Sequence, residues 1–448
     1  MRSFNALVGL LGIPVIFVSQ FTPTVAKSAE VPSTCRNIKS VTSKPMNGQA
    51  TVPEPPLFLV TPIPRLHLKP EALPRSLKLV QSTNAGNQDG LRNDVAATLT
   101  ATGQVSQALQ LVRFARSQAR KDELLATIAY ELLNTANVPQ ALQVAQTIGD
   151  RTSRTTVFAL MSIVLTDRGN ESSAIDVTQK IENRYDQAMV TGLVAARLTH
   201  FGKTPQGLQI AGQIDNPKVK AATLRLITHE LSKLNQFPRA EQVAQTIEDC
   251  AERSTAFVEI AEAGRAFGQL ELIPRMLVQA EQSGKLIDSA LLKVPLLVRI
   301  AYQYRALKNL QSMQSTLTQA LKDIPAIEDL LSQAQNLRDI ASQYRQAGFV
   351  QHALPLLAEA LQSAQKLRNS EAKSMLLMTI GFEYTGLGQK AQADKVFAQA
   401  MRSLPQSRSL PLFPPLPPPL PPKLIIPPQL RVKPEPPIPL IPVPSEKR

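Results

Sequence analysis

The feature that most constrains the fold of this 448-residue chain is a repeat of fixed period. A small or apolar residue recurs at Ala108, Ala141, Ala174, Gly207, Ala240, Ile273, Met313, Ala353 and Ala393. Successive residue numbers differ by 33 five times and then by 40 three times. Periods of this length are typical of repeat architectures, in which each unit packs on its neighbours. These nine units, within residues 91–404, therefore predict a solenoid.

Each unit has the pattern of two helices. In the last unit, apolar or small residues lie 9, 12, 13 and 16 positions before Ala393 and 4 and 7 positions after it. Steps of three and four return to the same helix face. The residues are Leu377, Ile380, Gly381, Tyr384, Phe397 and Ala400. Because no strand-like alternation occurs in residues 91–404, we predict an all-α fold.

This order of residues resembles the tetratricopeptide repeat (TPR). The resemblance is strongest over residues 281–404 and weaker over residues 91–280, where leucine replaces the tyrosine of the pattern. It implies a right-handed α-α superhelix of about nine helix pairs. Gly264 stands at the tyrosine position of the Ile273 unit, which fits neither class. Arg92 stands where the first unit needs a large apolar residue, so that unit is a candidate cap.

Turn and capping residues follow the same period. Asp150, Asn183, Asn216 and Asp249 recur at the shorter of the two intervals, between units, where we expect helix N-caps. Calcium binding is the alternative, but one carboxylate or amide per unit cannot converge on one ion. Within units, glycines should end the first helices at Gly103, Gly169, Gly202, Gly268, Gly348 and Gly388.

The flanks have a different composition. Residues 1–28 predict a signal peptide, with an apolar run over residues 6–18 that is shorter than the roughly 20 residues of a membrane span. An uncleaved anchor is the alternative. Residues 29–90 are rich in proline and predict an extended linker with at most a short helix near its end. Residues 405–448 contain 17 prolines and predict a disordered polyproline tail, either a spacer or a ligand for proline-binding grooves.

The net charge of +14 is concentrated outside the repeats. Residues 91–404 hold 34 basic and 29 acidic side chains, whereas residues 27–90 and 405–448 each carry an excess of four positive charges. No run of lysine and arginine with interleaved aromatic residues occurs. Specific nucleic-acid binding is therefore not expected.

No motif for chemistry is found. Two cysteines cannot build a disulfide framework or a cysteine-based zinc site. Export would permit a single bridge, but Cys35 falls in the predicted linker and Cys250 at a helix boundary, so the unpaired state is favoured. The four histidines, His67, His200, His229 and His352, form no metal-binding pair or triad motif. We predict no catalytic residue, no cofactor and no metal.

Binding is the function that stacked helix pairs favour, because their first helices line a concave surface. The resemblance implies that the position eight residues before each marker faces this surface, and Arg265, Arg305 and Arg345 stand there. It also places on this inner surface Arg225, His229, Tyr302, Arg338 and Phe382. Arginine binds carboxylates bidentately, which favours an acidic segment or a C-terminal carboxylate as ligand. The alternative is a solvated face with local salt bridges.

The sequence therefore predicts an exported scaffold or adaptor, periplasmic or extracellular in a bacterium, that binds a protein or peptide. No membrane span is expected to remain after signal cleavage. One alternative is an envelope-associated structural protein attached through its basic and proline-rich flanks. The other is an enzyme with an unrecognised site.

Overall fold

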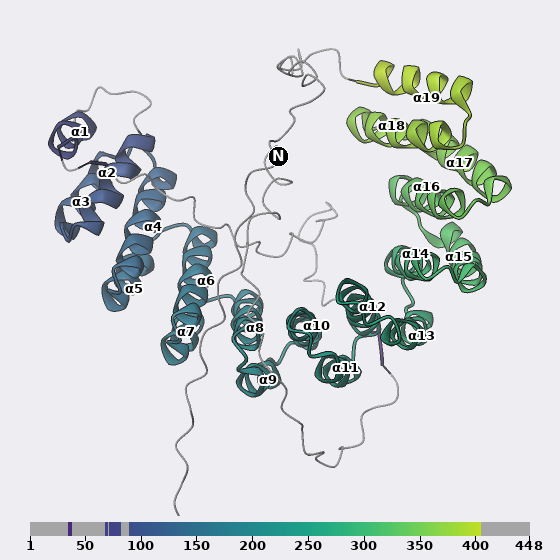
Figure 1. The fold of residues 1–448 in the computed structure, drawn as a ribbon. Helices are drawn as coiled ribbons and strands as arrows, with labels where there is room; N and C mark the ends of the chain where they lie inside the picture. The colour runs from purple at the N-terminus through teal and green to yellow at the C-terminus, as the bar shows by residue number, and fades with distance from the viewer. Residues whose placement is uncertain (1–34, 38–67, 70, 82–88, 405–448) are drawn as a thin grey trace, which may run out of the picture.

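The computed structural model describes residues 35–37, 68–69, 71–81 and 89–404. In this part of the chain, nineteen α-helices follow one another in a curved arc, and the one β-bridge joins Arg36 to Asp249 (Figure 1). The prediction of an all-α, TPR-like solenoid is confirmed. The signal peptide, most of the linker and the tail after residue 404 lie outside the described residues.

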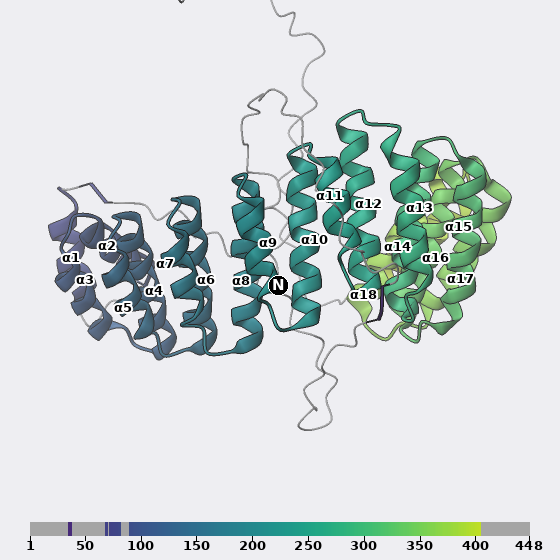
Figure 2. The same cartoon turned by 90° about the horizontal axis from the view of Figure 1, so that it is seen from below.

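Nine helix pairs make up the arc. The first helices are α2 (Asp89–Ala101), α4 (Gln118–Asn134), α6 (Arg151–Asp167), α8 (Arg184–His200), α10 (Pro217–Lys233), α12 (Cys250–Ala266), α14 (Ala290–Ala306), α16 (Leu330–Gln346) and α18 (Ser370–Gly386). The second helices are α3 (Val105–Leu111), α5 (Val138–Gln146), α7 (Glu171–Thr178), α9 (Thr204–Gly212), α11 (Phe237–Gln245), α13 (Leu272–Lys285), α15 (Leu310–Asp323), α17 (Val350–Gln365) and α19 (Lys390–Arg402). First helices line the inner side of the arc and second helices its outer side, while Figure 2 shows them standing side by side.

The two repeat lengths differ in their second helices. From α4 onward every first helix has 17 residues. The second helices α3 to α11 have 7–9 residues, and α13 to α19 have 13–16. The 40-residue repeat has seven more residues than the 33-residue repeat. Seven residues correspond to two helical turns, about 10 Å. The change occurs at α13, in the Ile273 unit that the sequence pattern assigned to neither class.

Every marker residue lies buried on a second helix, against the first helix of its own pair. Gly207 shows why small residues are needed, since a Cβ atom there would lie 2.5 Å from the Ala195 carbonyl oxygen. In the last pair, a Cβ on Gly381 would lie 2.5 Å from the Phe397 ring. The small residues therefore set the close approach of the two helices in a pair.

The predicted N-caps are confirmed. The side chains of Asp150, Asn183, Asn216 and Asp249 each accept backbone N–H bonds at the start of α6, α8, α10 and α12. These bonds satisfy donors that have no partner within the helix. The capping interpretation of these residues therefore has a structural basis in each of the four units.

Replacing Asn216 with alanine tests the contribution of one such cap. Its Oδ1 accepts from the backbone N–H groups of Lys218 and Val219, each at 3.1 Å. We expect the Asn216→Ala substitution to lower the free energy of unfolding by about 1 kcal/mol, measured by urea denaturation. Asn216→Ser keeps an acceptor and should lose less. Equal losses for the two variants would contradict the capping role.

The first helix of each pair ends at a residue in the left-handed backbone conformation, and this residue has the same position in every repeat. The six predicted glycines have φ between 73° and 84°, and Ala136, Asn235 and Lys308 take the same conformation in the other three pairs. These nine positions follow the same steps along the chain as the markers. The turn therefore has the same geometry in the three pairs that lack glycine, although L-residues disfavour this backbone conformation.

The N-terminal end of the arc is covered by α1 (Leu73–Gln81), the one described helix of the linker region. Arg92 is only 3% exposed beneath it. Its guanidinium donates to the Val80 carbonyl oxygen at 3.3 Å and pairs with Asp89 at 2.8 Å. The arginine that interrupts the repeat pattern thus bonds to the end of α1, while Leu77 and Val80 of α1 pack on the apolar core of the first pairs.

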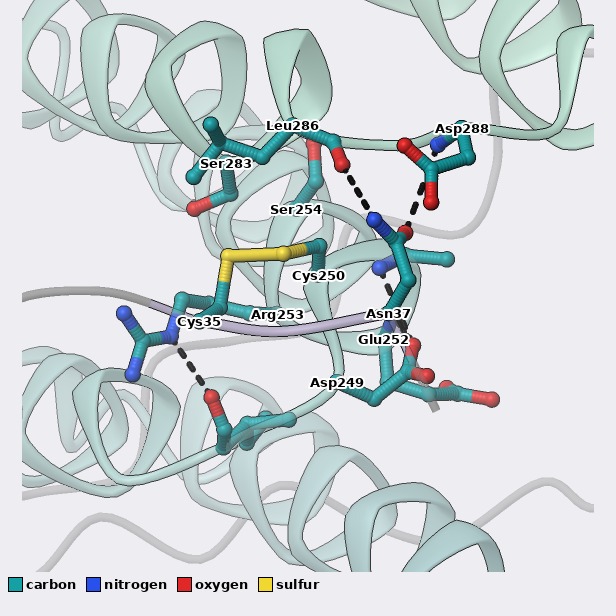
Figure 3. The surroundings of a disulfide bond; sticks show 12 residues. Cys35, Asn37, Asp249, Cys250, Glu252, Arg253, Ser254, Ser283, Leu286 and Asp288 are labelled. Carbon is teal, nitrogen blue, oxygen red and sulfur yellow. Dashed lines mark hydrogen bonds between the residues drawn. A yellow bond between two sulfur atoms is a disulfide. The ribbon is translucent and has the colours of Figure 1, made fainter. Parts of the chain in front are cut away.

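Residues 35–37, here called the strap, are joined to the middle of the arc by a disulfide between Cys35 and Cys250 (Figure 3). The expectation of unpaired cysteines is therefore wrong. The Arg36 N–H donates to the Glu248 carbonyl oxygen at 2.7 Å, and the Cys250 N–H donates to that of Arg36 at 3.1 Å. These bonds hold an extended segment against the α11–α12 turn, a pairing that the helical pattern of the sequence does not reveal.

The strap also reaches the next pair. Asn37 Nδ2 donates to the Leu286 carbonyl oxygen at 2.7 Å, and its Oδ1 accepts from the Asp288 N–H at 3.3 Å. Figure 3 shows this amide between the two residues. The strap therefore connects the α11–α12 turn with the α13–α14 turn, where the short second helices give way to the long ones.

Candidate functional site: the inner wall

The inner wall is the concave side formed by the first helices α2 to α18 (Figure 1). Polar pairs join consecutive first helices along it. They include Asp167–Arg197, His200–Glu230, Arg225–Glu252, Arg225–Glu259, Glu262–Arg299 and Arg345–Glu383. Several cations of the wall are therefore paired with a carboxylate of the neighbouring unit.

Two of the predicted wall residues belong to one such cluster. Arg225 lies 2.6 Å from Glu252 and 2.7 Å from Glu259, and His229 Nδ1 lies 3.7 Å from Glu259. Burial raises the pKa of Glu259 despite the nearby Arg225. The cluster holds α10 against α12, so Arg225 is occupied by structural contacts and is not an open cation.

Three others lie near the C-terminal end. Arg345 Nε donates to Glu383 at 2.7 Å, and Arg338 pairs with Asp339 at 2.6 Å. Phe382 is 61% exposed, with its ring 5.3 Å from that of Phe397. Local salt bridges, the alternative interpretation of this face, thus account for Arg338 and Arg345.

Arg265, Tyr302 and Arg305 form a different arrangement, here called the Arg–Tyr–Arg cluster. The two guanidinium carbons lie 5.1 Å and 5.2 Å from the centroid of the Tyr302 ring. Tyr302 is 37% exposed. Among the described residues, no carboxylate pairs with either arginine, and Arg305 Nε donates to the neutral Gln343 at 2.9 Å. Two positive charges therefore meet on one exposed aromatic ring.

Glutamine in place of glutamate explains why this part of the wall stays basic. Arg305 contacts position 343 in the way that Arg345 contacts position 383, at a separation of 38 residues in both cases. Position 383 is glutamate, whereas position 343 is glutamine. The equivalent Gln303 donates to Glu262, at 3.1 Å. Glutamine at two of the three positions removes the carboxylate that would otherwise neutralise the arginine.

Sequence reasoning found the arginines but missed their partners. The bidentate Arg299–Glu262 contact and the roles of Glu259, Gln343 and Glu383 were not predicted. A search for acidic or amide residues 38 positions after each arginine would have found the last two.

The contact between His200 and Glu230 gives the wall a pH-dependent part. The two side chains lie 2.8 Å apart, and Lys233 lies 3.1 Å from the same carboxylate. Burial disfavours ionisation of Glu230, but His200 and Lys233 outweigh it and lower its pKa below the ordinary value of a glutamate. The stabilisation is therefore present above the unfolded-state pKa and is lost as the pH falls through the folded-state pKa.

We expect Glu230→Gln to lower the free energy of unfolding by about 0.5–1 kcal/mol at pH 7 and to have little effect at pH 3. Urea denaturation at the two pH values measures the difference. A loss of the same size at both would show that the charge of Glu230 does not contribute.

The described part of the chain also has two cavities, and no residue of the Arg–Tyr–Arg cluster lines either of them. No three histidine, cysteine, aspartate or glutamate side chains in this part of the chain group as metal ligands would. A cavity of about 330 Å³ is lined by Arg36, Lys220 and Glu248 among others, and one of about 450 Å³ by residues of α1 to α3. No histidine lines either cavity. None of the described helices has both the length and the apolar character of a bilayer span.

The residues that carry the TPR resemblance pack as the pattern requires. In the last unit, Leu377, Tyr384, Ala393 and Ala400 are buried, and the Phe397 ring fills the space beside Gly381. The chain has a TPR-like fold. No family model matches it, and no curated protein sequence matches it.

Several solved structures are similar in outline. A signal transduction ATPase with a TPR sensor from Pyrococcus horikoshii has 12% identity and a TM-score of 0.33, over 72% of this chain and 54% of that one. The present chain thus spans about half of the ATPase. A Rap protein complexed with competence and sporulation factor has 11% identity and a TM-score of 0.28, over 70% and 97% of the two chains. A human IFIT1 dimer with m7Gppp-AAAA has 12% identity and a TM-score of 0.28, over 74% and 85%.

Proposed function

We propose that the TPR-like protein is a scaffold that binds an acidic segment of a protein partner on its inner wall. The observation that carries the proposal is the Arg–Tyr–Arg cluster, in which two arginines without a carboxylate partner among the described residues lie against an exposed tyrosine. A carboxylate can accept hydrogen bonds from a guanidinium that already stacks on an aromatic ring. An acidic side chain or a C-terminal carboxylate therefore complements this part of the wall.

The position of the cluster supports a protein ligand. It lies on α12 and α14 and contacts Gln343 on α16, where the longer repeats begin, so an extended segment along the wall would pass several first helices. The nearby Arg299 and Arg345 are paired with Glu262 and Glu383. An acidic segment would therefore contact the wall mainly at the Arg–Tyr–Arg cluster. Binding without catalysis is the role that this arrangement favours.

A direct binding measurement tests the proposal. Fluorescence anisotropy of a labelled hexaglutamate peptide with a free C-terminus should report binding to the full chain and weakening with salt. The double substitution Arg265→Glu and Arg305→Glu should weaken this binding at least tenfold, about 1.4 kcal/mol or more.

The matched control reverses two charges elsewhere. Arg239 on α11 and Arg402 on α19 are exposed, and neither pairs with a carboxylate among the described residues. Arg239→Glu with Arg402→Glu changes the net charge by the same amount and should leave the affinity within twofold. If both double variants weaken binding equally, net charge rather than the cluster attracts the peptide.

We further propose that the protein works outside the cytoplasm. The apolar run in residues 6–18 has the length of an export signal, and the Cys35–Cys250 bridge is of a kind that persists in oxidising compartments. Mass spectrometry of the native protein under non-reducing conditions tests both points. A chain that keeps residues 1–28 and has two free thiols would count against export.

Extraction at low and high salt addresses the alternative of an envelope-associated structural protein. Release from the envelope fraction by salt alone would favour attachment through the basic flanks. The fractionation tests the flanks, whereas the anisotropy measurement tests the inner wall. The two results are independent because both double variants change residues only within the repeats.

A further inference from the structure

The last first helix carries an apolar stripe on its surface. Met375, Met378 and Phe382 of α18 are 65%, 39% and 61% exposed. Their spacing of three and four residues places them on one helix face. Three large apolar side chains in a row are an unusual surface for the end of a solenoid, whose outer faces are normally polar.

Residues at the equivalent repeat position of other units show what this helix face contacts there. Phe382 corresponds to Ser342 on α16, to Tyr302 on α14 and to Glu262 on α12, at successive steps of 40 residues. Ser342 donates to Glu383 of the next first helix at 3.0 Å, and Glu262 binds Arg299 of the next first helix. In two of these three units the residue at the Phe382 position therefore contacts the following first helix, and no tenth first helix follows Phe382 in the described chain.

The chain itself leaves the solenoid beside this stripe. Ser374 Oγ donates to the Ala400 carbonyl oxygen at 2.9 Å, so the end of α19 lies level with Met375. The sequence then continues from Leu404 to Arg448, with apolar residues at positions 410, 412 and 413. The helical rise from Met375 to Phe382 is about 10 Å. About four residues in polyproline II conformation cover that distance.

We propose that residues 408–416 of the chain's own tail lie along Met375, Met378 and Phe382 and close the C-terminal end of the solenoid, as α1 closes the other end. Prolines cannot continue the helical repeat, but an extended proline-rich segment has few backbone donors left unpaired when it lies on an apolar surface. Aromatic-lined surfaces bind such segments because little conformational entropy is lost. The inference is independent of the acidic ligand proposed above.

Photocrosslinking in the full chain tests the contact. Benzoylphenylalanine at position 382 replaces an exposed aromatic side chain, and the same amino acid at Tyr185, which is 51% exposed on α8, is the control. Irradiation followed by peptide mapping should give crosslinks from position 382 to residues 405–420 in at least tenfold higher yield than from position 185. Mixing ¹⁵N-labelled and unlabelled chains distinguishes crosslinks within one chain from those between two.

A tail variant makes the result decisive without disturbing the repeats. Leu410→Ser, Leu412→Ser and Phe413→Ser together should reduce the yield from position 382 to that of the control, with an unchanged circular dichroism spectrum. Crosslinks from position 382 to α18 of a second chain would mean that the stripe is a dimer contact and would overturn the proposal. Absence of any crosslink to the tail would also overturn it.

Discussion

Gly207→Ala is expected to destabilise the protein by about 1–3 kcal/mol, although alanine is the better helix former. The added Cβ would lie 2.5 Å from the Ala195 carbonyl oxygen and 2.7 Å from Thr199 Oγ1. The first of these is a backbone atom, so α8 and α9 must move apart to accept the methyl group. Urea denaturation followed by circular dichroism measures the loss.

The control lies at the end of the same helix. A Cβ atom at Gly212 would have no other atom within 4 Å, so Gly212→Ala should be neutral or stabilising by about 0.5 kcal/mol. The same chemical change thus has opposite signs at the two glycines. If Gly207→Ala is as stable as Gly212→Ala, the marker residues do not set the helix spacing.

Removal of the strap disulfide should have the other large effect. The bridge between Cys35 and Cys250 closes a loop of 215 residues that contains α1 to α11. A chain-entropy estimate for this loop is about 5 kcal/mol, and native disulfides typically contribute about 2–4 kcal/mol. We expect Cys35→Ser to lower the free energy of unfolding by about 2–5 kcal/mol, measured by urea denaturation under non-reducing conditions.

Two comparisons separate the covalent bond from the other strap contacts. Arg36→Ala removes an exposed ion pair with Glu248 and should cost less than about 1 kcal/mol. Reduction of the wild-type protein should reproduce the effect of Cys35→Ser, because Cys250 stays in place in both. A Cys35→Ser variant no less stable than Arg36→Ala would show that the bridge does not stabilise the repeats.

The fold could be predicted because the packing of helix pairs repeats. A small residue is needed wherever two helices approach closely, so Ala108, Gly207 and Ala393 reveal the period regardless of the other residues between them. Caps such as Asn216 follow the same period because each first helix begins in the same way. Local rules of helix chemistry were therefore enough to predict the solenoid.

The strap could not be predicted by those rules. Cys35 and Cys250 are 215 residues apart, and their pairing depends on where a short extended segment crosses the α11–α12 turn. No periodicity relates residues 35–37 to the repeats. The contacts of Asn37 with the α13–α14 turn are equally specific to this chain.

The inner wall was predicted in part. The positions of Arg265, Arg305 and Arg345 follow from the repeat, but whether each remains an open cation depends on the residue 38 positions later. Glu383 neutralises Arg345, whereas Gln343 leaves Arg305 basic. A prediction based on the arginines alone treats the three as equivalent, and the difference between glutamate and glutamine separates them.

Photocrosslinking of an acidic peptide tests the central claim most directly. A hexaglutamate peptide with a photoreactive group at its N-terminus would be irradiated with the full chain, and the attachment sites mapped by mass spectrometry. The proposed scaffold predicts attachment to the first helices α12, α14 and α16, around Tyr302, and its loss with Arg265→Glu and Arg305→Glu. Attachment mainly to the outer helices α13, α15 and α17, or to the basic flanks, would contradict it.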